Sequence, residues 1–282
     1  MTWTQTLSLV AIVSVLAGTP ARPDATQAPR PAASASAPLT FGESFTIQSS
    51  VLAETRRINV YVPPLYGEAP DARRPVLYMP DGGMAEDFLH VAGLVQVSVG
   101  NGTMRPVVLV GIENTERRRD LSGPTENAED RKIAPRVGGS TAFRSFIRKE
   151  LMPVITSRYR TTPETAIVGE SLAGLFVVET LLLEPDLFTT YIAFDPSLWW
   201  NDGALVKGAA SRLKAGGAST RTLYFACSSE DRGDLCPQLA AVLRSSASSS
   251  LIWHYEPMPG EKHSTIFHPA AILAFRRVLK PL

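Results

Sequence analysis

Short, continuous runs of apolar residues recur along the chain and predict buried strands. A strand that is covered by helices on both faces carries apolar side chains at successive positions. Such runs occur at Val76–Met79, Val107–Val110, Ala166–Val168, Tyr191–Phe194, Leu223–Ala226 and Leu251–Trp253. Residues 57–62 instead alternate polar and apolar side chains before two prolines. That alternation predicts a half-exposed strand near a sheet edge.

Apolar residues at helical spacing fill the intervals between these runs and predict helices. One such face consists of Phe143, Phe146, Ile147, Leu151, Val154 and Ile155. Pro153 falls inside this pattern, so it must mark a kink or a helix boundary. Further patterns lie at Leu175–Leu183, Leu239–Leu243 and Ile272–Leu279. This succession predicts an α/β fold with a doubly wound, mostly parallel sheet and helices on both faces.

The composition fits one sizeable soluble domain with appendages. The chain has 282 residues, of which 44% are hydrophobic and 20% are charged, and its net charge is +1. This charge balance gives no electrostatic reason to expect nucleic acid or an anionic membrane surface as a partner. The sequence does not indicate an oligomeric state.

The N-terminal residues differ in composition from the rest. Leu7–Ala17 is an apolar run that is too short to span a bilayer and resembles the core of a secretory signal. Residues 20–38 contain five prolines and seven alanines, a composition typical of a disordered linker. We therefore predict a signal peptide at residues 1–21, a linker at 22–38 and a folded domain at 39–282, in an exported protein that is periplasmic or secreted. An apolar tail on a cytoplasmic protein is the alternative.

Ser171 stands at a predicted strand-to-helix turn, in the stretch Gly169-Glu170-Ser171-Leu172-Ala173-Gly174. A sharp turn of this kind requires small neighbours and lifts the serine hydroxyl above the edge of the sheet. The pattern matches the nucleophile elbow G-x-S-x-G, except that Ala173 occupies the second glycine position. A plain glycine-rich turn with a capping serine is the alternative interpretation.

A serine nucleophile needs a base, and His263 is the candidate. It lies in a polar loop after the last predicted strand, where a catalytic histidine is expected in this fold. His254 lies inside a strand, His90 in a helical pattern and His268 at the start of the final helix, so these three are expected to have structural roles. No carboxylate cluster or cysteine pair near His268 supports a metal site, and neither a metal nor an organic cofactor is expected.

The acid that orients the histidine is expected after the strand Leu223–Ala226. Asp231 is the first candidate there and Glu230 the second, with Asp234 also in the loop. The oxyanion donors are expected to be the backbone amides of Gly82 or Gly83, together with the amide of Leu172. For the glycine loop, a plain turn is the alternative.

Six stretches of the chain resemble the putative-esterase family of α/β hydrolases, which includes esterase-D-like and siderophore esterases. They are "VLYMPDGG", "VVLVGIENTERRRDLSGP", "AFRSFIRKELMPVITSRYR", "AIVGESLAGLFVVETLL", "YIAFDPSLWWND" and "MPGEKHST". The resemblance implies an α/β-hydrolase fold with Ser171 as nucleophile and His263 as base. The chain departs from the family pattern at Glu170, Ala173 and Asp195, the last of which stands where the family often has serine.

Three further residues are candidates for substrate binding. Arg119 could contact an acidic substrate, although a salt bridge within its loop is an equal alternative. Trp199 and Trp200 could line an aromatic or acyl pocket, or pack in the core.

These residues together predict a serine carboxylic-ester hydrolase that acts through an acyl-enzyme. Its partner would be a small-molecule ester with a short or medium acyl, phenolic or siderophore-type group, without nucleic acid and without stable membrane insertion. An exported acyltransferase on the same fold and a non-catalytic binding protein on a hydrolase scaffold are the alternatives.

The only two cysteines, Cys227 and Cys236, flank the loop that carries the candidate acids. In an oxidising compartment they could form a disulfide that stiffens this loop. Alternatively, Cys227 could pack as a small apolar side chain.

Overall fold

The computed structural model describes residues 36–64, 69, 71–214 and 219–281. The chain divides into two units, Met1–Thr40 and Phe41–Leu282. Residues 36–40 of the first unit are exposed and have no helix or strand. The predicted signal peptide and residues 22–35 of the predicted linker lie outside the described residues. The second unit begins two residues after Leu39, the predicted start of the folded domain.

The second unit is built on one sheet of eight strands. Their order across the sheet is β1-β2-β4-β3-β5-β6-β7-β8. β1 and β2 run antiparallel to their neighbours, and the strands from β4 to β8 are parallel. The strands are β1 (Glu43–Ser49), β2 (Glu54–Tyr61), β3 (Arg74–Pro80), β4 (Val108–Ile112), β5 (Thr161–Glu170), β6 (Thr190–Phe194), β7 (Arg221–Ser228) and β8 (Leu251–Met258).

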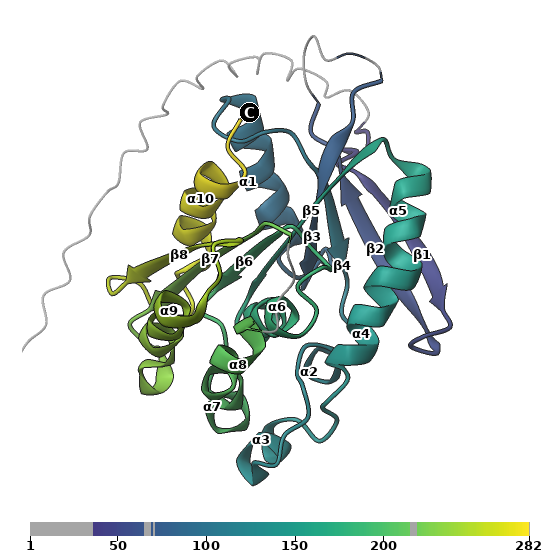
Figure 1. Cartoon of the computed structure of the whole chain (residues 1–282). Helices are drawn as coiled ribbons and strands as arrows, with labels where there is room; N and C mark the ends of the chain where they lie inside the picture. The colour runs from purple at the N-terminus through teal and green to yellow at the C-terminus, as the bar shows by residue number, and fades with distance from the viewer. Residues whose placement is uncertain (1–35, 65–68, 70, 215–218, 282) are drawn as a thin grey trace, which may run out of the picture. The chain divides into compact units, whose positions relative to one another are not determined.

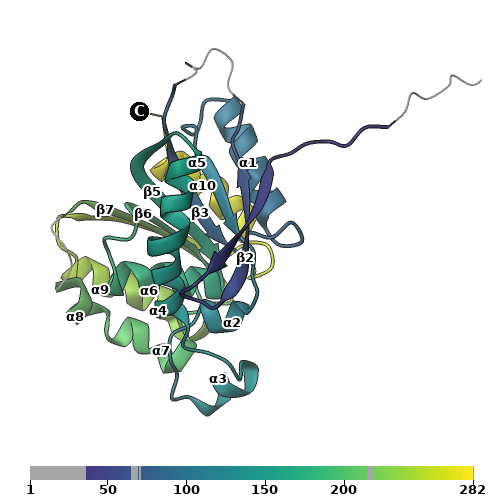
Figure 2. The same cartoon turned by 90° about the vertical axis from the view of Figure 1, so that its right-hand side faces the viewer.

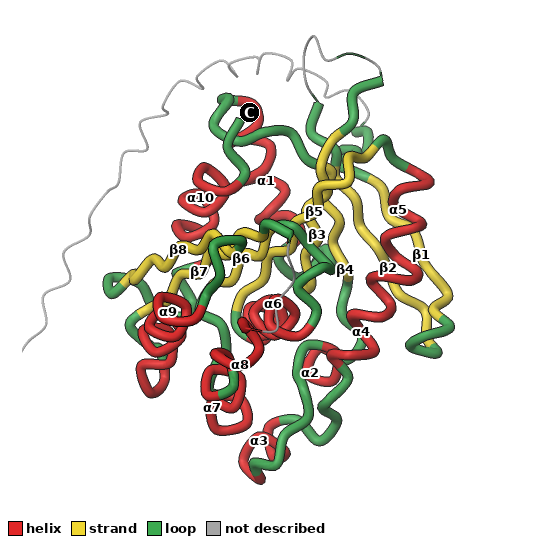
Figure 3. The backbone as a smooth tube through the Cα atoms, viewed as in Figure 1, coloured by secondary structure: helices red, strands yellow, loops and turns green. Residues whose placement is uncertain are grey.

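Helices connect these strands. They are α1 (Phe88–Gly100), α2 (Arg117–Asp120), α3 (Ala128–Ile133), α4 (Ser140–Phe146), α5 (Met152–Arg158), α6 (Leu172–Leu183), α7 (Trp200–Lys207), α8 (Ala209–Lys214), α9 (Leu235–Ser246) and α10 (Phe267–Val278). The long connection between β4 and α4 contains only the short helices α2 and α3, joined by loops (Figure 3).

Helices cover both faces of the sheet (Figures 1 and 2). α1 and α10 pack on one face, and α4, α5, α6 and α9 pack on the other. Side chains alternate between the two faces along each strand. In β6, Tyr191 and Ala193 contact the α6 side, whereas Ile192 and Phe194 contact the α10 side. Every position of β6 is therefore buried, which explains its continuous apolar run.

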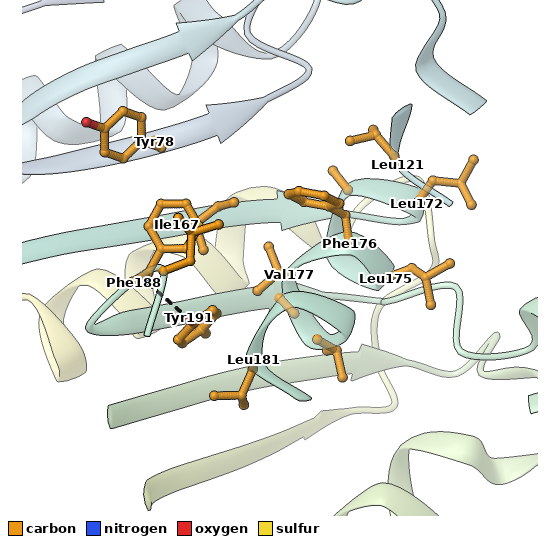
Figure 4. Close-up of a cluster of buried hydrophobic side chains, with 14 of the residues drawn as sticks. Tyr78, Leu121, Ile167, Leu172, Leu175, Phe176, Val177, Leu181, Phe188 and Tyr191 are labelled. Carbon is orange, nitrogen blue, oxygen red and sulfur yellow. Dashed lines mark hydrogen bonds between the residues drawn. The ribbon is translucent and has the colours of Figure 1, made fainter. Parts of the chain in front are cut away.

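The larger core lies on the α6 side (Figure 4). Phe176 and Val177 of α6 and Ile167 of β5 are 0% exposed there. Tyr191 buries a hydroxyl in this apolar layer, and the hydroxyl accepts a hydrogen bond from the Phe188 backbone amide at 3.1 Å. α6 has apolar side chains on nearly all sides because it is enclosed by the sheet and by α8.

The predicted fold class is confirmed, and each predicted strand and helix has a counterpart. The strand predicted at 57–62 is β2, beside the edge strand, but Ile58–Tyr61 are all buried and the predicted half-exposure is wrong. Two local features go beyond the predicted pattern. The pattern at 143–155 is one continuous helical stretch, in which a π-helical turn at Ile147–Leu151 joins α4 to α5. Pro153 lies in the first turn of α5, directly after the π turn, so it marks a helix boundary as predicted. β1, an additional edge strand, was not predicted.

The register of the sheet brings three chain segments to the same level. Glu170 at the end of β5 pairs with Phe194 at the end of β6, and Phe194 pairs with Ala226 of β7. The residues that follow, among them Ser171 and Asp195, therefore meet at the carboxyl edge of the sheet, where ligands bind in folds of this kind.

In the described part of the chain, no helix has both the length and the apolar composition needed to cross a bilayer.

Candidate active site

The turn between β5 and α6 forces Ser171 into an unusual backbone conformation. Its φ is 60° and its ψ is −121°, a region that non-glycine residues rarely adopt. The backbone around Ser171 also leaves no room for larger side chains at the neighbouring glycines. A Cβ atom on Gly169 would lie 2.7 Å from the Cβ of Ala173, and one on Gly174 would lie 2.9 Å from the carbonyl oxygen of Phe194. Ala173 fits the elbow because Gly169 has no side chain.

Backbone bonds hold this strained turn in place. The Ser171 amide donates to the carbonyl oxygen of Phe194 at 3.0 Å, and the Ser197 amide donates to the carbonyl oxygen of Ser171 at 3.0 Å. The hydroxyl oxygens of Ser171 and Ser197 lie 3.4 Å apart. The segment after β6 therefore positions the serine from two sides.

Asp195, the first residue after β6, binds the imidazole of His263. Its Oδ2 lies 2.6 Å from His263 Nδ1. The same carboxylate accepts the Ser228 amide and the Ser228 hydroxyl, each at 2.9 Å. The side chain of Asp195 is 6% exposed, compared with 45% for His263. A nearly buried, fully hydrogen-bonded carboxylate thus fixes one ring nitrogen and leaves Nε2 free to act elsewhere.

The charges around this pair move both pKa values in the direction of an ion pair. Burial opposes ionisation of Asp195, but the bonds from His263 and Ser228 hold its pKa below the usual value. The bond to Asp195 raises the pKa of His263 despite partial burial, and the charges of Glu170 and Glu230 add to this. The imidazolium form of His263 is therefore stabilised.

Ser171, Asp195 and His263 line one cavity of about 210 Å³. The other residues of its lining are Pro196, Ser197, Trp199, Glu230, Asp231 and Arg232. A strained serine and a carboxylate-bound histidine that line a common cavity are the groups that nucleophilic catalysis requires.

The structure places neither predicted acid on the imidazole of His263. Asp231 lines the cavity, but its Oδ2 accepts the backbone amide of Cys236 at 2.9 Å at the start of α9. Burial raises the pKa of Asp231, the opposite of what an imidazolium partner would do. Glu230 binds the backbone amide of His263 at 3.0 Å and not its ring. Asp231 orients its own loop, Glu230 anchors the histidine loop, and Asp195 alone binds the imidazole.

The predicted oxyanion donors differ in their availability. The Gly82 amide donates to the carbonyl oxygen of Ile112 at 3.0 Å, so it is no longer a candidate. The Gly83 amide donates to Glu86 Oε2 at 2.7 Å, so an oxyanion would have to displace that carboxylate. Leu172 is the first residue of α6, and amides in a first helical turn have no intrahelical partner. Leu172 therefore stays the better candidate.

Two of the three predicted substrate-binding residues lie elsewhere. Arg119 binds Asp120 at 2.6 Å and Glu54 at 2.7 Å, and these bonds raise its pKa, which is the salt-bridge alternative. Trp200 is 5% exposed, and its Nε1 donates to the carbonyl oxygen of Gly123 at 3.0 Å, so it packs in the core. Trp199 is in the cavity lining, as predicted.

The remaining histidines lie outside the cavity lining. His90 Nε2 lies 3.0 Å from His268 Nδ1, so this pair links α1 to α10, and His254 belongs to β8. Within the described ranges, no group of three or more His, Cys, Asp or Glu side chains could hold a metal ion.

Cys227 and Cys236 form a disulfide. It closes the loop between β7 and α9, which carries Glu230, Asp231 and Arg232 into the cavity wall. The sequence had left the choice between a bridge and a packed thiol open, and the structure contains the bridge.

The disulfide leads to a first prediction. The protein, produced in an oxidising compartment, then denatured and alkylated without reductant, should incorporate no alkyl groups by intact mass, and two after reduction. Replacing both cysteines with alanine should lower the free energy of unfolding by about 2–3 kcal/mol, since the bridge closes a loop of 9 residues. Two alkylated thiols without reductant would contradict the bridge.

Glu170 leads to a second prediction. Burial raises its pKa to about 7, with Asp87, Asp195 and Asp81 adding to the effect and His263 opposing it. As a carboxylate, Glu170 raises the pKa of His263. Glu170→Gln removes that charge, so the acidic limb of the pH–rate profile should move to lower pH, because His263 must be neutral to act as a base. Glu129→Gln, at an exposed site on α3, is the control. An unmoved limb would show that Glu170 does not act on His263.

The fold and the site together define a class of protein. A parallel sheet with a serine elbow after one central strand, followed by a carboxylate-bound histidine after the last strand, is the arrangement of an α/β hydrolase. Residues 49–264 match the family described as "Putative esterase", and the chain belongs to that family.

Similar proteins of known sequence are siderophore esterases. The chain is 33% identical over 171 residues to the ferri-bacillibactin esterase BesA of Bacillus subtilis, an alignment that covers 55% of this chain and 58% of that protein. It is 23% identical over 169 residues to the iron(III) salmochelin esterase of Escherichia coli, covering 56% and 36%. The chain thus spans between a third and three fifths of the length of these relatives.

Solved structures agree on the fold. An IroE-like serine hydrolase from Shewanella oneidensis is 29% identical, with a TM-score of 0.75, and the match covers 84% of this chain and 80% of that one. The BES protein from Bacillus cereus has a TM-score of 0.75 at 20% identity, covering 89% and 100%, which shows a shared fold alone.

Proposed function

We propose that the protein is an exported serine hydrolase of carboxylic esters, with Ser171 as nucleophile, His263 as base and Asp195 as the acid. The observation that carries this proposal is the 2.6 Å bond between Asp195 and His263 Nδ1 in the cavity that Ser171 lines. The apolar run near the N-terminus and the disulfide support the assignment to an exported protein.

The reaction proceeds through two tetrahedral intermediates. His263 Nε2 takes the proton of the Ser171 hydroxyl as its oxygen attacks the ester carbonyl, while Asp195 stabilises the imidazolium. The negatively charged oxygen is bound by the Leu172 amide at the positive end of α6, and by the Gly83 amide once Glu86 turns away. His263 then gives the proton to the departing alcohol, which leaves an ester on Ser171. A water molecule, activated by the same imidazole, releases the acid and restores the serine.

The expected substrates are esters with short or medium acyl, phenolic or siderophore-type groups. Five of the nine residues that line the cavity carry ionisable side chains, so burying a long alkyl chain there would leave polar groups unsatisfied. Siderophore-type esters enter this group because the relatives above are named for ferri-bacillibactin and iron(III) salmochelin.

A panel of 4-nitrophenyl esters tests this proposal. The acetate and butyrate should be hydrolysed with a higher kcat/KM than the laurate and palmitate, and release of a linear product from a trilactone siderophore can be followed by chromatography. A preference for emulsified long-chain triglyceride would contradict the proposed substrate class.

A further inference from the structure

One wall of the active-site cavity is a stacked pair of flat side chains. The guanidinium carbon of Arg232 lies 4.9 Å from the ring centroid of Trp199. Both residues line the cavity together with Ser171 and His263. An arginine over an indole face is a favourable arrangement, because the guanidinium is planar and the ring face carries negative charge.

Arg232 is otherwise unengaged. Its side chain has no ion pair and no hydrogen bond to another side chain in the part of the chain that the structure describes, and its residue is exposed. Most other arginines in this unit bind carboxylates, as Arg117 binds Asp81 and Arg144 binds Glu179. The outer face of the Arg232 guanidinium is thus available to a ligand.

The wall is held in position before any ligand arrives. Arg232 lies on the loop closed by the Cys227–Cys236 disulfide. The Asp231 carboxylate binds the Cys236 amide at 2.9 Å, and the Gln238 side chain donates to the carbonyl oxygen of Gly233 at 2.8 Å. The backbone that carries Arg232 therefore loses little conformational freedom on binding.

The charges near the wall select among possible ligands. Glu230 and Asp231 precede Arg232 and also line the cavity, and Asp234 follows in the same loop. These three acids outnumber the single guanidinium of Arg232, so an acyl group that carries its own carboxylate would meet a net negative charge and be disfavoured. A saturated chain would cover the guanidinium without replacing its hydration. A neutral aromatic ring avoids both penalties and can stack on the wall.

We propose that Trp199 and Arg232 form an acyl-binding subsite that selects neutral aromatic acyl groups over saturated and carboxylate-bearing ones. This inference rests on the proposed ester hydrolysis at Ser171, and it adds the residues that choose the substrate. Neither residue takes part in the bond-making steps, so changing them should alter the choice of substrate more than the chemistry.

Three esters with the same 4-nitrophenyl leaving group test the subsite: the benzoate, the cyclohexanecarboxylate and the 4-carboxybenzoate. The measured quantity is the ratio of kcat/KM for the benzoate to that for each of the others, compared between the parent and its variants. Comparing variants cancels the different intrinsic reactivities of the esters. Trp199→Leu should lower the benzoate-to-cyclohexanecarboxylate ratio by on the order of tenfold, and Arg232→Gln by roughly threefold.

In the double variant, the benzoate-to-cyclohexanecarboxylate ratio should fall by less than the product of the two single-variant factors, because the two side chains act as one stacked unit. Arg232→Gln should also lower the benzoate rate more than the rate for 4-nitrophenyl acetate, which is too small to reach the wall.

The matched controls are Arg244→Gln, exposed on α9, and Trp253→Leu on β8, neither of which is in the cavity lining. Both should leave the ratio within twofold of the parent.

Two results would overturn the subsite. One is a ratio that stays within twofold of the parent in Trp199→Leu and Arg232→Gln while acetate hydrolysis continues. The other is a kcat/KM of the parent that is higher for the 4-carboxybenzoate than for the benzoate after each is divided by the rate of its uncatalysed hydrolysis. Loss of all ester hydrolysis in the parent would instead end the proposed function. In that case, ligand-observed NMR with benzamide and cyclohexanecarboxamide still tests the subsite. The parent should bind benzamide but not cyclohexanecarboxamide, and Trp199→Leu should bind neither.

Discussion

Ser171→Ala and His263→Ala are each expected to lower the kcat for ester hydrolysis by on the order of 10³-fold or more. The nucleophile and its base act as one unit, so removing either leaves only the binding and oxyanion contributions. Activity is measured with 4-nitrophenyl butyrate, and folding is verified from the unfolding midpoint, which should stay near that of the parent because His263 is half exposed.

Two matched substitutions control for general effects at these positions. Ser264→Ala removes an exposed hydroxyl next to His263, and His254→Gln changes a histidine on β8 that is not in the cavity lining. Both should retain activity within threefold of the parent. A Ser171→Ala protein with activity within tenfold of the parent would end the serine mechanism.

Asp195→Asn is expected to lower kcat by on the order of 10²-fold or more, with little change in KM. The two oxygens of Asp195 accept three hydrogen bonds, one from His263 and two from Ser228. Asparagine has one acceptor oxygen, so either the imidazole or Ser228 loses its partner. The loss of negative charge also removes a cause of the raised pKa of His263, so the residual activity should have its acidic limb at lower pH.

Asp231→Asn and Glu230→Gln provide the comparison for this substitution. Both acids line the same cavity but contact backbone amides, at Cys236 and His263 respectively. Their effects on kcat should therefore stay within about tenfold. A larger loss from Asp231→Asn than from Asp195→Asn would restore the assignment made from the sequence, and equally mild effects from all three would indicate a Ser–His dyad.

The sheet and its main helices could be predicted because burial on both faces leaves a direct trace in the sequence. The run at Tyr191–Phe194 is apolar at every position, since alternate side chains enter the two cores. β1 leaves a weaker trace. Its residues alternate in burial and it lies at the sheet edge, so its sequence Glu43–Ser49 is largely polar.

The candidate nucleophile and base could be located because each depends on local sequence. The acid could not, because its position depends on which strands are neighbours. β6 lies between β5 and β7, so the first residue after β6 lies between Ser171 and the loop after β7. An aspartate directly after a buried run is the available signal, and the sequence marks Asp195 only as a departure from the family pattern.

The glycine loop after β3 illustrates the same limitation. Sequence identified Gly82 and Gly83 as flexible positions near the site, but hydrogen-bond partners decide whether an amide is available. Gly82 binds Ile112 across the sheet and Gly83 binds Glu86. Likewise, two adjacent tryptophans differ in environment: Trp200 is buried and donates to the carbonyl oxygen of Gly123, whereas Trp199 lines the cavity.

Labelling with a fluorophosphonate tests the central claim most directly. Such a reagent reacts with a serine only when a neighbouring base activates it. We predict one phosphonyl group per chain by intact mass, located at Ser171 by peptide mapping, with labelling slowed strongly in His263→Ala and Asp195→Asn and unchanged in Asp231→Asn. An unlabelled protein, or a label at any other residue, would contradict the account.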